Sequence, residues 1–346
     1  MAYHRYMTKP QVLLLFGGES TEHDVSVMSA HNVYDAIDRE TFDVVLGYID
    51  QQGQWFHLSE FDQYRSTDSR PPLEPQLGNG SFVAGRSTLK PDVLLPILHG
   101  KNGEDGSVQG LAQLLHVPVV GCDMTASAAG MDKVIAKRIA AQNDIQVVPY
   151  LVHRRGDEVP HYETIQRVLG GTLFVKPSRA GSSVGVSKVR NEQELSQALE
   201  AALLVDDTIL IERALTVREL EVAVLGIPPH HEVSRVGEVI PGEDFYSYDD
   251  KYSQSSSSSV KIPADITPEQ MNTLRSQAAR LFTELGCQGL SRVDFFLAGD
   301  GAIYFNEINT LPGFTNISMY PKLWQDTGLS YAALVTRLVR DALNTK

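Results

Sequence analysis

The segment that most constrains the fold is an unbroken apolar run near the N-terminus that ends in two glycines. Residues 11–16 read Gln-Val-Leu-Leu-Leu-Phe, and Gly17 and Gly18 follow directly. A strand that is apolar at consecutive positions is typical of a parallel sheet that is buried on both faces. The run therefore predicts a buried parallel strand that enters a tight loop, where glycine frees the backbone.

Strand-like and helical segments continue to alternate up to about residue 122. A helix is expected from about Ser26, and further strands are expected over residues 42–49, 91–98 and 117–121. This alternation predicts a doubly wound α/β domain over residues 1–122. The stretch between Arg65 and Arg86 is rich in Pro, Gly and Ser, and we expect loop or irregular structure there.

The rest of the chain mixes helices with antiparallel strand pairs, as in an α+β fold. The apolar spacing is helical over residues 125–142, and Asn191 and Thr267 are N-cap signals for two later helices. Residues 171–177 and 186–189 predict a hairpin around a loop rich in glycine and serine. Further strands are expected over residues 147–152, 209–212 and 220–226, and a closing helix is expected over residues 331–343.

Composition argues against several kinds of partner. The chain has 346 residues and a formal net charge of -13, so it offers no global basic field to nucleic acid or to an anionic membrane. No apolar run approaches the roughly 20 residues needed to span a bilayer, and the polar N-terminus lacks a signal-type core. The two cysteines, Cys122 and Cys287, indicate neither a disulfide framework nor a zinc site. We expect a cytoplasmic enzyme of two or three domains.

Two strand-like segments near the C-terminus carry polar residues two positions apart. One holds Glu307 and Asn309, and the other holds Arg292 and Asp294. Period-two alternation places each pair on one face of its strand. Side by side, the two strands would gather three oxygen ligands and one fixed positive charge, which suits Mg²⁺ and the phosphates of a nucleotide. Either strand taken alone is equally consistent with ordinary solvated acids.

A loop rich in glycine and serine follows Lys176 and covers residues 178–185. Backbone N–H groups in such a loop can cradle phosphate, and the lysine adds a point charge. The loop is not a Walker A motif. Its Gly-x-Ser-x-Gly pattern places Ser183 where a hydrolase nucleophile would lie, but that motif needs a helix directly after it, and residues 186–189 predict a strand. A plain hairpin turn is the alternative.

Two further glycine-rich loops, over residues 17–26 and 99–106, leave predicted strands at their C-terminal ends. Ligands of open α/β sheets bind at that edge. His99 is flanked by glycine there, which favours a role in the site over a purely structural one. Lys133, Glu212 and Glu219 are each compatible with nucleotide binding, although each taken singly is more often a solvated surface charge.

Taken together, these segments resemble the D-alanine–D-alanine ligase family of the ATP-grasp superfamily. The resemblance runs from Gln11 to Leu343 and rests on eight motifs in order. The motifs are GGESTEHDVS (17–26), HGKNGEDGSVQG (99–110), MDK (131–133), FVKPSRAGSSVGVSKV (174–189), REL (218–220), FYSYDDKY (245–252), SRVDFF (291–296) and NEINTLPGFTNISMYP (306–321).

The resemblance implies a three-domain ATP-grasp architecture and a defined reaction. The N-terminal domain of residues 1–122 would be followed by a central subdomain, 123–215, and a C-terminal subdomain, 216–346. Such enzymes use ATP to convert one D-alanine into a D-alanyl phosphate, which the amine of a second D-alanine attacks, and the dipeptide feeds peptidoglycan synthesis. A nucleophile other than D-alanine, such as another D-amino acid or D-lactate, and a non-catalytic nucleotide-binding module are the alternatives.

The resemblance also implies residue roles. Two Mg²⁺ or Mn²⁺ ions would be held by Asp294, Glu307 and Asn309. Nucleotide-binding residues would be Lys133, Lys176, Ser183, Glu212, Glu219 and Lys251. Substrate-binding residues would be Glu22, His99, Arg292, Ser318 and Met319. Catalytic residues would be Glu22, Ser182, Tyr252, Arg292 and the backbone N–H of Gly313.

A mobile lid and a homodimer complete what the resemblance implies. Tyr252 would join Glu22 and Ser182 in a hydrogen-bonded set, and its presence favours an amine over D-lactate as nucleophile. A lid over about residues 246–260, rich in serine, would close over ATP and D-alanine and exclude water from the acyl phosphate. The family suggests a homodimer that forms through the N-terminal domain.

Overall fold

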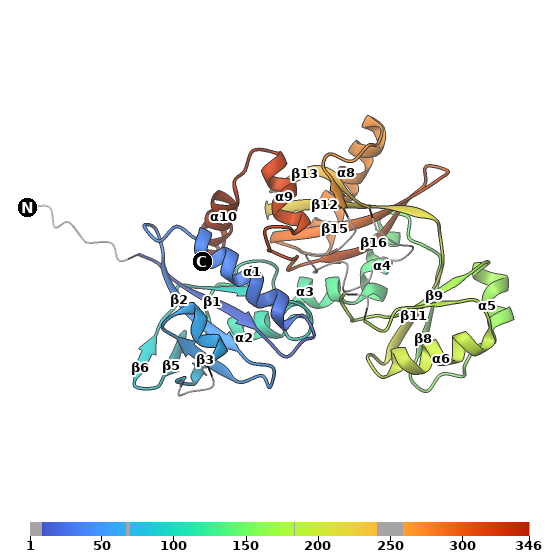
Figure 1. Cartoon of the computed structure of the whole chain (residues 1–346). Coiled ribbons are helices and arrows are strands. Elements are labelled where there is room, and N and C mark those ends of the chain that lie inside the picture. Colours follow the sequence, from blue (N-terminus) through green and yellow to red (C-terminus); the bar gives the residue numbers. More distant parts are fainter. Residues whose placement is uncertain (1–8, 67–69, 183, 241–258, 346) are drawn as a thin grey trace, which may run out of the picture.

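The structure is a computed structural model that describes residues 9–66, 70–182, 184–240 and 259–345. The described strands form four sheets. In Figure 1 the sheet within residues 150–213 lies at the end of the molecule opposite the N-terminal sheets, and the sheet within residues 217–309 lies between them. Most of the predicted lid lies outside the described residues. Among the residues that are described, no helix is both long enough and apolar enough to cross a membrane.

The first sheet confirms the doubly wound prediction for the N-terminal part. Its strands are β1 (Gln11–Gly17), β2 (Asp43–Ile49), β3 (Trp55–Leu58) and β7 (Val93–Ile97), in the order β3-β2-β1-β7. Strand β1 is parallel to β2 and to β7, and β3 is an antiparallel edge. Leu13, Leu14 and Leu15 are fully buried, as the continuous apolar run predicts. Residues 117–121 form no full strand there, only a parallel bridge between Val119 and Leu94.

Helix α1 (His23–Ala36) starts three residues earlier than predicted. Ser26, the expected start, lies inside the helix and is completely buried. Its hydroxyl accepts a hydrogen bond from the N–H of Gly17 and donates one to the carbonyl of Ile97. The serine therefore joins the ends of β1 and β7, and so fixes the two loops that leave the sheet there.

The prediction of irregular structure between Arg65 and Arg86 is wrong. A 3-10 helix, η1 (Phe61–Arg65), leads into an antiparallel sheet of β4 (Leu73–Gln76), β5 (Ser81–Ala84) and β6 (Ser87–Leu89). Leu73 and Phe82 of this sheet are buried in a core shared with β1 and with helix α2 (Ser107–Leu115). The strands are too short for their alternation to stand out against the surrounding turn residues.

The helix predicted over residues 125–142 is broken in two at Asp132. Helix α3 (Met124–Met131) ends there and α4 (Lys133–Gln142) begins. The Asp132 carboxylate accepts from the N–H groups of Val134 and Ile135, at 3.0 and 3.1 Å. It also accepts from the Ser178 hydroxyl at 2.7 Å. The break therefore ties the start of α4 to the loop that follows Lys176.

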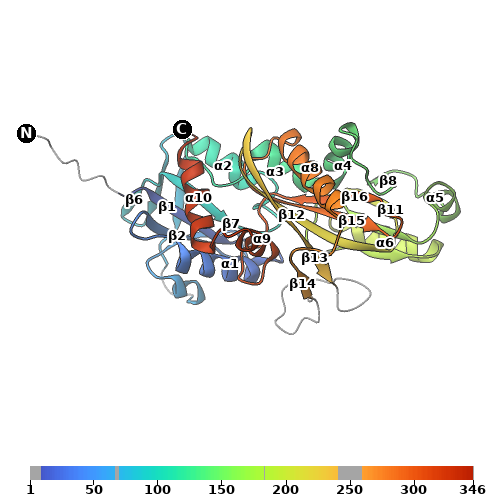
Figure 2. The ribbon, with the colours of Figure 1, turned by 90° about the horizontal axis from the view of Figure 1, so that it is seen from above.

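Two antiparallel sheets build the rest of the molecule (Figure 2). The first has the order β10-β9-β11-β8 and the second the order β14-β13-β12-β15-β16. The strands of the first are β8 (Tyr150–Arg154), β9 (Leu173–Pro177), β10 (Ser187–Val189) and β11 (Thr208–Arg213). The strands of the second are β12 (Val217–Ile227), β13 (His230–Ile240), β14 (Ser259–Lys261), β15 (Gly289–Ala298) and β16 (Ile303–Asn309). The predicted hairpin is confirmed as β9 and β10, whereas β8 starts three residues later than expected.

Helices cover both sheets, and two of them begin at the predicted capping residues. The helices are α5 (Tyr162–Leu169), α6 (Glu192–Leu203), α8 (Pro268–Glu284), α9 (Met319–Asp326) and α10 (Tyr331–Leu343). The Asn191 side chain caps α6, and Thr267 with Gln270 forms the capping box of α8. Helix α10 returns to the N-terminal domain, where its Val335 and Leu338 share one buried core with Val33 of α1 and Leu95 of β7 (Figure 1).

Candidate functional site

Three neighbouring strands carry a row of carboxylates on one face. Glu221 of β12 lies opposite Asp294 of β15, and Asp294 lies opposite Glu307 of β16. Asn309 lies opposite Arg292 in the same register and donates from Nδ2 to Asp294 Oδ2 at 3.0 Å. The predicted adjacency of the two polar strands is therefore present. The structure gathers three carboxylates at one level of the sheet, with one carboxamide and one guanidinium at the next level on the same face.

Arg292 is held by two carboxylates at once. Its Nε lies 2.8 Å from Asp294 Oδ1 and 2.9 Å from Glu221 Oε2, and its Nη2 lies 2.7 Å from Asp294 Oδ2. Burial alone would lower the pKa of this guanidinium, but Asp294 and Glu221 hold it well above the usual value. The positive charge is thus permanent, and the two carboxylates fix its direction.

Three lysines pair with the acidic residues of this region. Lys133 Nζ lies 3.1 Å from Glu307 Oε2 and donates to the carbonyl of Ala180 at 2.8 Å. Glu212 takes the other two: Lys176 Nζ lies 2.6 Å from its Oε2, and Lys137 Nζ lies 2.8 Å from its Oε1. Burial would raise the pKa of Glu212, but the two ammonium groups lower it to about 2.

The loop after Lys176 is fixed at its base and meets the N-terminal domain at its tip. At the base, the Asp206 carboxylate accepts from the backbone N–H of Arg179 at 2.7 Å and from its guanidinium. At the tip, the Ser182 hydroxyl donates to the Glu22 carboxylate. A side chain at Gly181 would place its Cβ 3.1 Å from Glu22 Oε2, a tight contact that glycine avoids.

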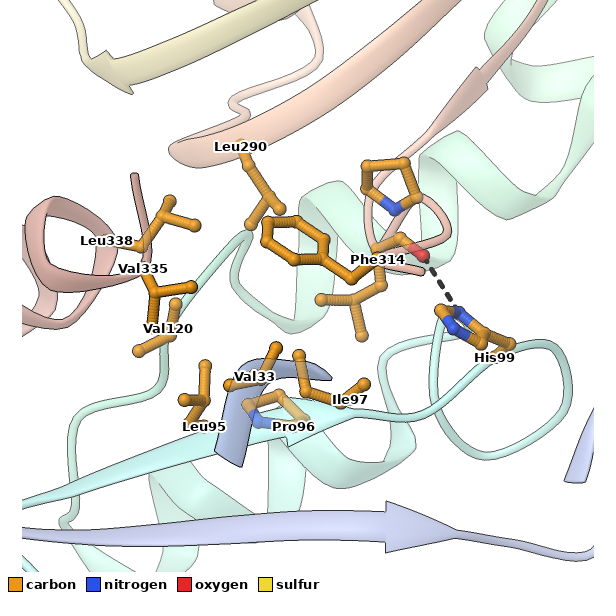
Figure 3. Close-up of a pocket in the computed structure, with 12 residues that line it drawn as sticks. Val33, Leu95, Pro96, Ile97, His99, Val120, Leu290, Phe314, Val335 and Leu338 are labelled. Atoms are coloured by element: carbon orange, nitrogen blue, oxygen red, sulfur yellow. Dashed lines mark hydrogen bonds between the residues drawn. The ribbon is translucent and has the colours of Figure 1, made fainter. Parts of the chain in front are cut away.

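His99 joins the N-terminal sheet to the segment that follows β16. Its Nε2 lies 3.1 Å from the Ser29 hydroxyl of α1, and its Nδ1 lies 3.2 Å from the carbonyl of Leu311. The ring lies at the edge of an apolar cavity between β7, α10 and Phe314, whose lining side chains are drawn in Figure 3. The volume of this cavity is about 20 Å³. That volume has room for about one water, which such a lining does not retain. Burial lowers the pKa of His99, so the ring is neutral at neutral pH.

The turn after β16 brings Gly313 and Ser318 together. The Ser318 hydroxyl accepts from the N–H of Thr315 at 3.0 Å, and a Cβ on Gly313 would lie 2.9 Å from that hydroxyl. Met319 is buried against the backbone of β13, where a Cβ on Gly237 would lie 2.8 Å from its sulfur. Both glycines leave room for a close approach that a side chain would block.

Comparisons with known proteins agree with this geometry. The family model described as D-ala D-ala ligase N-terminus matches residues 11–122, and the model described as D-ala D-ala ligase C-terminus matches residues 139–340. The chain belongs to the D-alanine–D-alanine ligase family. Its mixed α/β fold with several sheets is the ATP-grasp fold of that family, as predicted.

Relatives align over nearly the whole chain. D-alanine–D-alanine ligase A of Escherichia coli is 42% identical over 353 residues, covering 97% of this chain and 96% of that protein. The D-alanine–D-alanine ligase of Geobacillus kaustophilus is 43% identical, with 97% and 95% covered. Among solved structures, the VanG D-Ala:D-Ser ligase from Enterococcus faecalis aligns with a TM-score of 0.88 at 36% identity, covering 96% of this chain and 99% of that one. The D-alanine-D-alanine ligase from Coxiella burnetii aligns with a TM-score of 0.86 at 31% identity, with 97% and 94% covered.

Besides His99 and the turn that holds Gly313, Ser318 and Met319, the residues predicted for a D-alanine–D-alanine ligase site form three groups in the structure. One is the Arg292, Asp294, Glu307, Asn309 and Lys133 row, one is the Lys176 and Glu212 pair, and one is the contact of Glu22 with Ser182. Glu219 lies two positions before Glu221 on β12. Ser183, Lys251 and Tyr252 lie outside the described residues, and all the assigned roles stay predictions.

The sequence-based prediction missed three charged residues of this site. Glu221 is two positions from Glu219 and so shares its face of β12. Lys137 lies one turn after Lys133, in a buried stripe with Val134 and Ala140. A lysine within such a stripe was a usable signal. Glu104 follows His99 in the second glycine-rich loop and accepts from the N–H of Gly100 at 2.9 Å.

Glu104 provides a test of the electrostatics beside Glu22. Burial and the Glu22 carboxylate raise the pKa of Glu104 from 4.5 to about 8. Because the pKa of Glu104 is higher in the folded protein than in the unfolded chain, protonation of Glu104 stabilises the fold. This contribution is complete below pH 4.5 and is lost as the pH rises to about 8. We therefore expect the stability of Glu104→Gln relative to the wild type to increase as the pH rises from 4.5 to about 8. Above that pH the difference in stability between the two proteins should be constant. Chemical denaturation at a series of pH values measures the difference.

The matched control is Glu74→Gln, which changes an exposed glutamate of β4 in the same domain. Its stability relative to the wild type should not vary across the window. A pH-independent difference for Glu104→Gln as well would show that Glu104 ionises normally in the folded protein.

Proposed function

We propose that this chain is an ATP-dependent ligase that joins two D-alanine molecules into D-alanyl-D-alanine through a D-alanyl phosphate, releasing ADP and phosphate. The observation that carries the proposal is the row of Arg292, Asp294, Glu307 and Asn309 beside Lys133, in a chain of this family. The dipeptide would enter peptidoglycan precursor synthesis.

ATP would bind between the two antiparallel sheets. Lys133 and Lys176 supply positive charge for its phosphates, and the loop over residues 178–182 supplies backbone N–H groups. The ring centroids of Phe174 and Phe296 lie 5.8 and 5.9 Å from Lys176 Nζ, so two aromatic rings lie beside this ammonium group. Glu212 and Glu219 would accept from the adenine amino group and the ribose hydroxyls.

The carboxylate row fits Mg²⁺ or Mn²⁺. Asp294, Glu307 and Asn309 offer hard oxygen donors on one face of two paired strands. No group of three His, Cys, Asp or Glu side chains arranged to hold a metal occurs among the described residues, so the phosphates would have to supply further ligands. When bound, such ions would neutralise the phosphate oxygens and favour transfer of the γ-phosphoryl group.

The two D-alanines would lie on opposite sides of Arg292. Glu22, held by Ser182, would accept from the ammonium group of the first, with His99 nearby. The second would contact Ser318 and Met319. Arg292 and the N–H of Gly313 would donate to the oxyanion that forms when the amine attacks the acyl phosphate. The buried setting of these groups would exclude water, which otherwise hydrolyses that intermediate.

A coupled assay of ADP release tests the proposal. We expect ADP release with ATP, Mg²⁺ and D-alanine, none with L-alanine, and a D-alanyl-D-alanine product by mass spectrometry. Binding of ATP without any release that depends on a D-amino acid would indicate a non-catalytic module instead.

D-serine is the alternative second substrate that an observation favours, because one of the aligned structures is a D-Ala:D-Ser ligase. Assays with D-alanine paired against D-serine or D-lactate separate the candidates. A mixed product that exceeded D-alanyl-D-alanine at equal concentrations would overturn the assignment of the second D-alanine.

A further inference from the structure

Lys137 is a buried cation for which the reaction has no direct use. It lies on α4, one helical turn after Lys133, and its side chain is 1% exposed. Removing a lysine charge from water is costly unless a partner compensates for it. The partner is Glu212 on β11, whose side chain is 2% exposed and whose Oε1 lies 2.8 Å from Lys137 Nζ.

Glu212 holds two lysines that differ in what they can reach. Lys176, at 2.6 Å from Oε2, has a side chain that is 15% exposed and lies beside the loop over residues 178–182. Lys137, on Oε1, has a side chain that is only 1% exposed and pairs with this carboxylate. Burial lowers the pKa of Lys137, and Glu212 is the group that most opposes that effect.

A bound nucleotide would change the balance of charge around Glu212. Its phosphates would share the ammonium of Lys176, which is now engaged by Oε2. The Glu212 carboxylate would then face a polyanion with less compensation from Lys176. A second cation beside Glu212, out of reach of the phosphates, would keep the charge of this carboxylate compensated.

We propose that Lys137 is a positioning residue of the nucleotide site, whose ammonium keeps the Glu212 carboxylate in place when Lys176 turns toward the phosphates of bound ATP. Lys176 is the exchangeable partner of Glu212, and Lys137 is the permanent one. The inference rests on the proposed function, because it assigns the ligand of Glu212 and Lys176 as a nucleotide.

Calorimetric titration of ADP with Mg²⁺ into Lys137→Met tests the inference without turnover. Loss of the charged contact should weaken ADP binding by a factor of about ten. The KM for ATP should rise to a similar extent, while the KM for D-alanine stays unchanged. Arg138→Met is the matched control, since it removes the next cation of the same helix, which is exposed, and should leave both constants unchanged.

A double variant separates positioning from simple stability. If Lys137 acts through Glu212, the Lys137→Met/Glu212→Gln protein should bind ADP no more weakly than Glu212→Gln alone. Effects that instead add in full would overturn the inference, as would a Lys137→Met protein that melts earlier but binds ADP like the wild type. Should Lys137→Met not fold, Lys137→Gln, which can still donate a hydrogen bond to Oε1, takes its place, with an intermediate loss of ADP affinity expected.

The same titration distinguishes the two proposals. A wild type that bound no ADP would overturn the proposed function together with this inference. A wild type that binds ADP with an affinity that Lys137→Met and Lys137→Gln both retain would overturn only the role of Lys137.

Discussion

Replacing Arg292 with lysine is expected to lower kcat by a factor of about 10² or more while leaving ADP binding unchanged. Lysine keeps the positive charge, so Asp294 and Glu221 stay compensated and the fold is preserved. It cannot reproduce the forked contact in which Nε and Nη2 hold both oxygens of Asp294. Without that contact, the cation is no longer fixed where the oxyanion of the proposed intermediate would form.

Steady-state kinetics of Arg292→Lys, with calorimetric titration of ADP, measures the effect. The control is Arg218→Lys, which changes a similar forked pair, Arg218 with Glu238, on the opposite face of β12. It should keep kcat close to that of the wild type. A kcat for Arg292→Lys equal to that of the control would show that the direction of the guanidinium does not matter, and the oxyanion role would then fail.

The row around Arg292 shows what residue spacing can predict. Period-two spacing was enough to place Arg292 with Asp294 on one face of their strand, and Glu307 with Asn309 on one face of theirs. The short turn between β15 and β16 makes the two strands antiparallel neighbours, so their polar faces coincide. Glu221 escaped prediction because β12 lies far from β15 along the chain. Spacing within a strand says nothing about which distant strand pairs with it.

The break between helices α3 and α4 and the small sheet of β4 to β6 were harder to predict, because both depend on contacts with distant segments. Asp132 ends α3 because its carboxylate caps α4 and binds Ser178, and Ser178 lies in a segment distant in sequence. Strands β4 to β6 exist because Leu73 and Phe82 complete a core that α2 and β1 begin. In both cases a tertiary contact outweighs the local preference of the segment.

The ion pair of Lys137 and Glu212 shows that buried charges are equally hard to predict from sequence. The sequence identified Glu212 as one candidate acid among many, and each such acid is more often solvated. Only the folded structure reveals that its carboxylate is 2% exposed and lies between the ammonium groups of Lys137 and Lys176. The burial that hides this pair from sequence analysis also makes it energetically important.

Glu212→Gln is therefore expected to destabilise the protein by about 3 kcal/mol at neutral pH, because it leaves two ammonium groups without their buried counter-ion. The wild-type pKa is lowered from 4.5 to about 2, so this contribution is present above pH 4.5 and is lost as the pH falls toward 2. The gap between wild type and Glu212→Gln should thus be constant from neutral pH to about 5 and narrow below 4.5.

Denaturant unfolding at a series of pH values measures this gap. Glu200→Gln is the matched control, because it makes the same change at an exposed position of α6, the helix that packs on β9 and β11. It should cost little at any pH, since a solvated carboxylate loses no buried partner. A Glu212→Gln protein as stable as this control at neutral pH would mean that Lys137 and Lys176 are compensated by other groups. The pair would then be no more than a packing contact. A stability difference that stays unchanged as the wild-type carboxylate protonates would instead assign the loss to the shape of the amide, because position 212 is the only titrating group that differs between the two proteins.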